Sequence, residues 1–309
     1  MEEKICYLGQ QSVFEEASKT FHQLRGIEVQ AKQIERVCHY FGEELTVELP
    51  LSKGKQTEEP EQWEAKEAKT EPHYVMMDGT MILTREEQWK EVKLGRVFSA
   101  RDNVTTSKDR GIILCSEYVA HLGGHEAFLQ QMEYYTDAIK EKIFIADGAK
   151  WIWSWVEAYY PESVQILDFY HAKEHLCDYA KIRFRSPKSM KDWIDKQTEL
   201  MLNDNMKQVM INIKVIPFHS TQQEKYSREK LLAYYQRNMK RMRYKTFQQA
   251  GYVIGSGAME AAHRNVIQKR LKLSGQRWTK KGAQQILNLR VLEKSNKWSR
   301  VIKFAKKAA

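Results

Sequence analysis

The 309-residue chain has few cysteines and no long apolar run. Its four cysteines are widely spaced and include no C-x-x-C pair, which argues against a disulfide framework or a cysteine zinc site. No window approaches 18 uncharged apolar residues, and the opening residues MEEKICYLGQ have neither the basic region nor the apolar core of a signal peptide. These absences predict a soluble cytoplasmic protein with reduced thiols and no membrane association.

Charge is unevenly distributed along the chain. Residues 1–70 carry 14 acidic and 9 basic side chains, a net charge of −5, whereas residues 241–309 carry 17 basic and 2 acidic, a net charge of +15. Clustered positive charge interleaved with Tyr244, Trp278 and Trp298 is typical of a surface that contacts nucleic-acid phosphates. A solvated lysine-rich tail is the alternative explanation.

The first 50 residues have helical periodicity. Apolar side chains in residues 8–24 recur at three- and four-residue spacing, and Ala31–Phe41 predicts a second helix after a turn at Gly26. Two helices around a tight turn resemble a helix-turn-helix. A structural helical hairpin is the alternative, because the region is net acidic and exposes few readers of bases or phosphates: Lys32, Gln33, Arg36 and His39.

A linker is predicted at residues 51–71, where charge, Pro and Gly occur with almost no apolar anchors. Strands are then expected at 73–83, 88–100 and 110–120, followed by a helix around 124–140 and by strands ending at Asp147 and near Asp168. Between Ala172 and Gly251 the strand pattern gives way to helical patterns. This order predicts an α/β fold with a mixed sheet that a helical insertion interrupts.

Sequence after the insertion predicts two helices. Ser256 is a plausible N-cap for the first, which would turn Met259, Val266, Ile267 and Leu271 toward the core. The second is expected from about Lys280 to Glu293.

Two apolar strands run into an Asp-Gly pair, at Asp78 in YVMMDGTMI and at Asp147 in IFIADGAKWIW. Each strand is expected to end at its Asp, so that the glycine turns the backbone away and the two carboxylates lie side by side. Adjacent carboxylates repel unless a cation lies between them, and hard oxygen ligands suit Mg²⁺ or Mn²⁺. Glu260, in the first turn of the helix that GSGAME opens, is the expected third ligand. An ordinary turn is the alternative for either Asp-Gly pair.

In this order, Asp78, Asp147 and Glu260 resemble the acidic triad of DDE transposases, whose catalytic domain has a ribonuclease-H-like fold. There the first Asp lies on the first strand, the second follows the fourth strand, and the Glu lies on a helix behind an insertion. GSGAMEAAHRNVIQKRLKLSGQRWTKKGAQQILNLR resembles the end of the catalytic domain in the Kra-group lineage of bacterial insertion-sequence transposases. LDFYHAKEHL, with Asp168 and His171, is similar to the Asp-x-x-His motif of mutator-like relatives.

The resemblance covers about residues 8–295 and completes the domain prediction. A ribonuclease-H-like core would comprise two segments, a helical insertion would separate them, and helical and basic regions would flank them. The predicted segments are 1–50 (helical), 51–71 (linker), 72–171 (core), 172–250 (insertion), 251–295 (core) and 296–309 (basic tail).

The resemblance implies a mechanism and partners. Two Mg²⁺ or Mn²⁺ ions held by Asp78, Asp147 and Glu260 would activate a water, and later a 3′-hydroxyl, for attack on a DNA phosphodiester. The implied partners are double-stranded DNA at the insertion-sequence ends and the target, and a second copy of the chain in a dimer on DNA, at the bacterial nucleoid. Residues expected to contact DNA are His171, His263, Arg264, Lys269, Arg270, Lys272, Arg277 and Trp278.

Several of these residues have alternative roles. His171 and His175 lie four apart, a spacing that could also bind zinc. His263, one turn after Glu260, is expected to contact the acidic site or a phosphate, and a helix-surface role fits it equally well. Trp278 fits core packing.

Two other functions stay open at this point: a non-catalytic, domesticated or truncated DNA-binding protein of the same fold, and a ribonuclease-H-like nuclease. A protein that only binds DNA has no need for three clustered acids. A nuclease of this kind would lack a helical insertion of about 80 residues.

Overall fold

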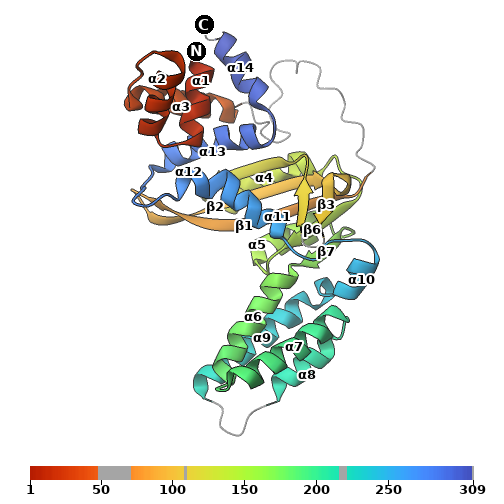
Figure 1. The fold of residues 1–309 in the computed structure, drawn as a ribbon. Helices are drawn as coiled ribbons and strands as arrows, with labels where there is room; N and C mark the ends of the chain where they lie inside the picture. Colours follow the sequence, from red (N-terminus) through yellow and green to blue (C-terminus); the bar gives the residue numbers. More distant parts are fainter. Residues whose placement is uncertain (48–70, 108–109, 216–220, 308–309) are drawn as a thin grey trace. The chain divides into compact units, whose positions relative to one another are not determined.

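The computed structural model describes residues 1–47, 71–107, 110–215 and 221–307 (Figure 1). The predicted linker therefore lies, except for Glu71, outside the described residues. The chain divides into two compact units, one of residues 1–142 and 258–309 and the other of residues 143–257. This division differs from the predicted one. The N-terminal helices share a unit with the first strands, and β6 (Lys142–Ala146) and β7 (Val164–Leu167) lie, except for Lys142, in the unit of the helical insertion.

The first unit begins with three helices: α1 (Glu2–Gln11), α2 (Phe14–Arg25) and α3 (Ala31–Val47). The single helix predicted at 8–24 is two helices, since Ser12, with an extended backbone, ends α1. Gly26 ends α2 as predicted, in the left-handed conformation with φ 68°. The apolar face of α3 packs against α13 (Lys280–Lys294), and this contact buries the apolar side chains of α3 in the core of the unit.

Three antiparallel strands of the first unit follow, in the order β5-β2-β1: β1 (His73–Thr84), β2 (Gln88–Ser99) and β5 (Glu117–Leu122). Asp78 lies opposite Leu94, and Val92 lies opposite Leu122. A short 3-10 turn (Ala100–Asp102) leads into a separate hairpin of β3 (Asn103–Ser107) and β4 (Arg110–Ile113). The strand predicted at 110–120 is therefore wrong as a single strand, because its first part pairs with β3 and its second part with β2.

Helices complete the first unit. After β5 comes α4 (His125–Thr136), and the C-terminal part holds α11 (Gly257–Ala262), a π-helical segment (His263–Gln268), α12 (Lys269–Leu271), α13 and α14 (Trp298–Lys307). The predicted inward side chains Met259, Val266, Ile267 and Leu271 are buried. The basic tail is a helix that packs on the N-terminal helices, with Phe304 5.1 Å from Phe41 and Trp298 5.3 Å from Tyr7 between ring centroids.

The second unit pairs β6 (Lys142–Ala146) in parallel with β7 (Val164–Leu167), joined through α5 (Lys150–Tyr159). The rest is helical, with α6, α7, α8 and α9 packed side by side (Figure 1). This confirms the helical character of the predicted insertion. The bounds are α6 (Phe169–Arg183), α7 (Pro187–Leu202), α8 (Met206–Lys214), α9 (Gln222–Asn238), a 3-10 turn (Met239–Arg241) and α10 (Tyr244–Gln249).

The strands β1, β2, β5, β6 and β7 form one five-stranded mixed sheet, so the predicted mixed α/β class is confirmed. In the described part of the chain, no helix combines the length and the apolar character needed to cross a membrane.

Candidate active site

Asp78 lies in the middle of β1. The strand predicted at 73–83 is confirmed, but the expectation that Asp78 closes it is wrong, because Gly79 pairs with Lys93 and the strand continues to Thr84. The carboxylate is accessible, with 31% of the side chain exposed. Its Oδ1 accepts the Gly79 N–H at 2.7 Å, and its Oδ2 lies 3.0 Å from Nε2 of His263.

His263 is buried and orients Asp78. A carboxylate only accepts hydrogen bonds, so the imidazole donates from Nε2, while its buried Nδ1 has no hydrogen-bond partner. His263 follows Glu260 by three residues, and both lie on the same continuous run of helix. The contact therefore ties the Glu-bearing helix to the strand that carries Asp78. The burial of His263 argues against the predicted DNA contact and against the helix-surface alternative.

Glu260 is exposed in the first turn of α11, as predicted. The segment after it, His263–Gln268, is π-helical, and such segments are frequent at functional sites. Arg290 on α13 is buried and donates to two carbonyls of this segment, from Nε to Val266 O at 2.5 Å and from Nη2 to Asn265 O. Its Nη1 donates to Gln10 O of α1 at 2.8 Å. Arg290 therefore holds the π-helical turn in place.

Arg96 on β2 fixes the start of the same helix. Its Nη1 donates to the Ala258 carbonyl at 2.7 Å, and its Nε donates to Ser116 Oγ at 3.0 Å. The guanidinium lies 5.3 and 5.4 Å from the ring centroids of Tyr118 and Phe98. Sequence reasoning missed this residue, although a charged side chain between Gly95 and Val97 in a strand with a buried face was a usable signal.

Asp147 directly follows β6 in the second unit, as predicted. Its Oδ1 accepts the Ala149 N–H at 3.0 Å, and its carbonyl accepts from Trp153 Nε1 at 2.6 Å. The glycine after it is required by packing, because a methyl group on Gly148 would overlap the ring of Tyr234 on α9. Burial, together with the Asp147 and Asp168 carboxylates nearby, raises the pKa of Tyr234.

Asp168 is a buried structural clamp in the second unit. It is the N-cap of α6, where Oδ1 accepts the N–H groups of Tyr170 at 2.6 Å and His171 at 3.2 Å. Its Oδ2 accepts the Ser256 N–H at 2.8 Å and the Ser256 hydroxyl. The serine hydroxyl predicted to cap the next helix is therefore used to hold the segment before α11 against the start of α6.

The neighbouring histidines have local partners. Nδ1 of His171 lies 3.5 Å from Oε2 of Glu174, and the side chain remains 39% exposed, so a DNA contact stays a prediction. His175 packs against the ring of Tyr234, with the centroids 4.4 Å apart, and burial lowers its pKa.

Of the three acidic residues, Asp78 and Glu260 belong to the first unit and Asp147 to the second. In the described ranges, no three His, Cys, Asp or Glu side chains form a group that could hold a metal ion. The donors themselves, three carboxylates, are of the hard oxygen type that Mg²⁺ and Mn²⁺ prefer. Their joint action on a metal stays a prediction.

The predicted DNA-contact residues divide by exposure. Arg264, Lys269, Lys272 and Arg277 are exposed, and Lys272 Nζ donates at 2.9 Å to Thr80 Oγ1, two residues beyond Asp78. Arg270 and Trp278 are only 1% and 8% exposed. The guanidinium of Arg270 lies between the rings of Phe14 and Trp278, and its Nε donates to Gly9 O at 3.0 Å. Neither side chain therefore lies on the open surface, and their contact with DNA stays a prediction.

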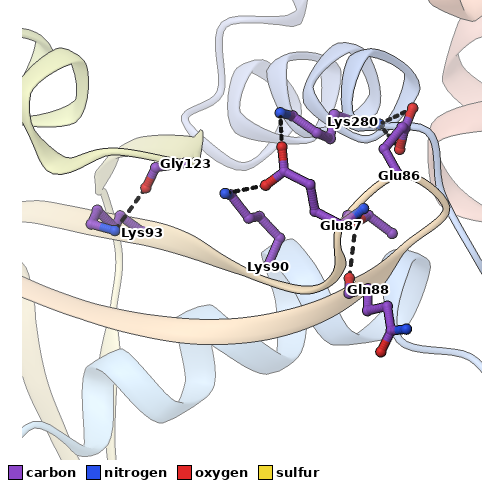
Figure 2. A network of polar contacts seen from close by, with 8 residues as sticks. Glu86, Glu87, Gln88, Lys90, Lys93, Gly123 and Lys280 are labelled. Carbon is purple, nitrogen blue, oxygen red and sulfur yellow. Dashed lines mark hydrogen bonds and ion pairs between the residues drawn. The ribbon is translucent and has the colours of Figure 1, made fainter.

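The tip of the β1–β2 hairpin is tied to the start of α13 (Figure 2). The Lys280 N–H donates to the Glu86 carboxylate at 3.2 Å, and the Lys280 and Lys90 ammonium groups both pair with Glu87. Hydrogen bonds from these two lysines lower the pKa of Glu87 to about 2. The tip also contains Gln88, whose φ of 57° is unusual for a residue other than glycine.

A family model matches residues 10–308, which span both units and all three acidic residues. The chain belongs to the uncharacterised protein family UPF0236. No curated protein matches this UPF0236 chain.

Proposed function

We propose that the chain is a DDE-type transposase, which cleaves DNA phosphodiesters and transfers the strands at insertion-sequence ends. The order of the acidic residues on the elements carries this proposal. Asp78 lies on the first strand, Asp147 directly follows β6, the fourth strand of the five-stranded sheet along the chain, and Glu260 lies on the helix behind the helical insertion. This order supports a ribonuclease-H-like catalytic domain.

Asp78, Asp147 and Glu260 would hold the two divalent ions. When bound, Mg²⁺ or Mn²⁺ would supply a Lewis acid that lowers the pKa of water and stabilises charge on the phosphate. The side chains around two of the acids have positioning roles in this proposal. His263 orients the Asp78 carboxylate, and Arg96 fixes the backbone two residues before Glu260.

Exposed basic residues would bind the DNA. Arg264, Lys269 and Lys272 follow Glu260 within a few helical turns, so they would neutralise phosphates beside the scissile bond. The proposal includes a dimer on double-stranded DNA, with the element ends and the target as its substrates.

A cleavage assay tests the proposal. Purified protein would be incubated with duplex DNA carrying the ends of its own element, with Mg²⁺ or Mn²⁺, and compared with the Asp147→Asn variant. The substitution keeps the shape and removes the charge, so cleavage and strand transfer should fall by orders of magnitude while DNA binding survives. The matched control is Asp195→Asn, at an exposed aspartate on α7 of the same unit, which should cleave like the wild type.

Either of two outcomes would contradict the proposal. Undiminished metal-dependent cleavage by Asp147→Asn would remove this residue from the mechanism. Wild-type protein that binds the ends and never cuts them would favour the alternative of a non-catalytic, domesticated or truncated DNA-binding protein.

A further inference from the structure

A cavity of about 380 Å³ lies within the first unit, and none of Asp78, Asp147 and Glu260 lines it. Its walls come from α2, α3, the tip of the β1–β2 hairpin and the loop before α13. The residues that matter for its chemistry are Phe14, His39, Arg85, Arg270, Arg277 and Trp278.

Positive charge dominates the lining of this cavity. Three arginines, Arg85, Arg270 and Arg277, line it together with a single acidic residue, Glu35, whose carboxylate pairs with Lys32 at 2.7 Å. Burial lowers the pKa of Arg270 to about 10, so the side chain is still charged at neutral pH. The cavity therefore favours an anion.

Two of the lining residues have a buried nitrogen without a hydrogen-bond partner, Nη2 of Arg270 and Nε2 of His39. Neither atom is open to the cavity, so an anion would reach it only after the side chain turns. An unpaired buried guanidinium nitrogen costs free energy, and an anion that the Arg270 side chain turned to meet would remove that cost. Burial also lowers the pKa of His39, and a nearby anion would favour its protonated, donating form.

The surrounding backbone holds the cavity in shape. Trp278 pairs with the end of β1: its N–H donates to Leu83 O at 3.1 Å, and its carbonyl accepts the Arg85 N–H at 2.8 Å. Nε of Arg85 donates to the Arg277 carbonyl at 3.2 Å, which keeps both exposed arginines at the same place. The ties from Lys280 to Glu86 and Glu87 fix the same hairpin tip (Figure 2).

We propose that this cavity is a phosphate site that takes one phosphate group, with its adjoining sugar, from a bound DNA strand. The volume is many times the roughly 10–15 Å³ that one water needs on this measure, which leaves room for a phosphate with its adjoining sugar. Along β1, Arg85 lies seven residues beyond Asp78, or about 23 Å at about 3.3 Å per residue. That distance equals roughly seven base pairs, so the site would hold the DNA well outside the scissile position.

This inference rests on the proposed function for the source of the phosphate, and the test separates the two. Binding of a fluorescent 30-base-pair duplex would be measured between low and moderate salt for the wild type, Arg277→Gln and Arg85→Gln. Both side chains are exposed, and Arg277→Gln should keep the wild-type unfolding midpoint. Arg85→Gln also loses the hydrogen bond to the Arg277 carbonyl, so its unfolding midpoint is measured alongside. The matched control is Arg25→Gln, at an exposed arginine on α2 that does not line the cavity.

The expected result is that each cavity variant lowers the log-log salt slope by about one unit, as loss of one phosphate contact does, and that Arg25→Gln leaves the slope unchanged. Equal effects of all three substitutions, or no effect of any, would overturn the phosphate site. A protein that binds DNA through the cavity without cleaving any DNA would contradict the proposed function and leave this inference intact.

A second measurement covers ligands other than DNA. Inorganic phosphate and pyrophosphate would be added to the wild type and to Arg277→Gln during thermal unfolding. If the protein bound no duplex, the proposal that the phosphate comes from DNA would be overturned, even if either anion stabilised the wild type and not the variant. Stabilisation confined to the wild type, in a protein that also binds duplex through these arginines, supports the site.

Discussion

At the scale of single residues, the two Asp-Gly pairs differ in what their glycines do. A methyl group on Gly79 would meet only the carboxyl end of the Glu91 side chain, which is flexible and can move away. A methyl group on Gly148 would meet the Tyr234 ring, whose position is fixed by the packing of α9. The same dipeptide is therefore replaceable at one site and required at the other.

We predict that Gly148→Ala destabilises the protein by about 1–3 kcal/mol, the usual cost of overpacking a buried site. Gly79→Ala is the matched control, and it should cost clearly less because alanine also suits a strand better than glycine does. Urea unfolding of both variants measures the difference. Equal stability of the two variants would show that Tyr234 does not restrict residue 148.

At the scale of elements, the π-helical segment between Glu260 and α13 depends on one arginine. Arg290 donates to the buried carbonyl of Val266 and to the partly buried carbonyl of Asn265. Removing the guanidinium would leave the Val266 carbonyl buried without this donor, which costs about 1–3 kcal/mol, and would also break the two buried hydrogen bonds to Gln10.

We therefore predict that Arg290→Met lowers the free energy of unfolding by about 2–4 kcal/mol. Arg264→Met, at an exposed arginine inside the π-helical segment itself, should stay within about 0.5 kcal/mol of the wild type. Thermal or urea unfolding compares the two. An equal loss in both variants would mean that methionine, and not the lost hydrogen bonds, causes the effect.

Element patterns in the sequence predicted much of this architecture. Alternation predicted β1 and β2, and three- and four-residue spacing predicted α3 and α13, because these elements bury one regular face. The bounds of β1 were predicted within one residue, but Asp78 was wrongly taken to close the strand, because an Asp-Gly pair is typical of a turn unless the partner strand, here at Lys93, is known. The roles of Arg96, Arg270 and Arg290 could not be predicted, since each is buried by partners distant in the sequence, and the pattern alone treats arginine as exposed.

At the scale of the whole molecule, basic charge and structural packing share the C-terminal helix. The apolar side of α14 packs on α1 and α3, with Val301 fully buried, while Lys303, Lys306 and Lys307 are exposed. Deleting this helix would remove packing together with charge. Neutralising its lysines isolates the electrostatic contribution.

We predict that replacing the three lysines of α14 by glutamine lowers the log-log salt slope of duplex DNA binding by about two to three units. The matched control replaces three exposed cations of the acidic N-terminal region, Lys4, Lys19 and Arg25, by glutamine. The control should keep the wild-type slope. If the salt slope of the control fell as much as that of the α14 variant, DNA binding would not be localised to α14.

The central claim is that Asp78, Asp147 and Glu260 act together on divalent metal. The most direct measurement is a crystal structure of the protein with Mn²⁺ and its DNA ends, in which anomalous scattering locates the ions. The account predicts ions about 3.5–4 Å apart, bound by all three residues, with carboxyl groups within about 4–8 Å of one another. Manganese bound without any one of these three carboxylates, or three carboxylates that do not share a site, would contradict it.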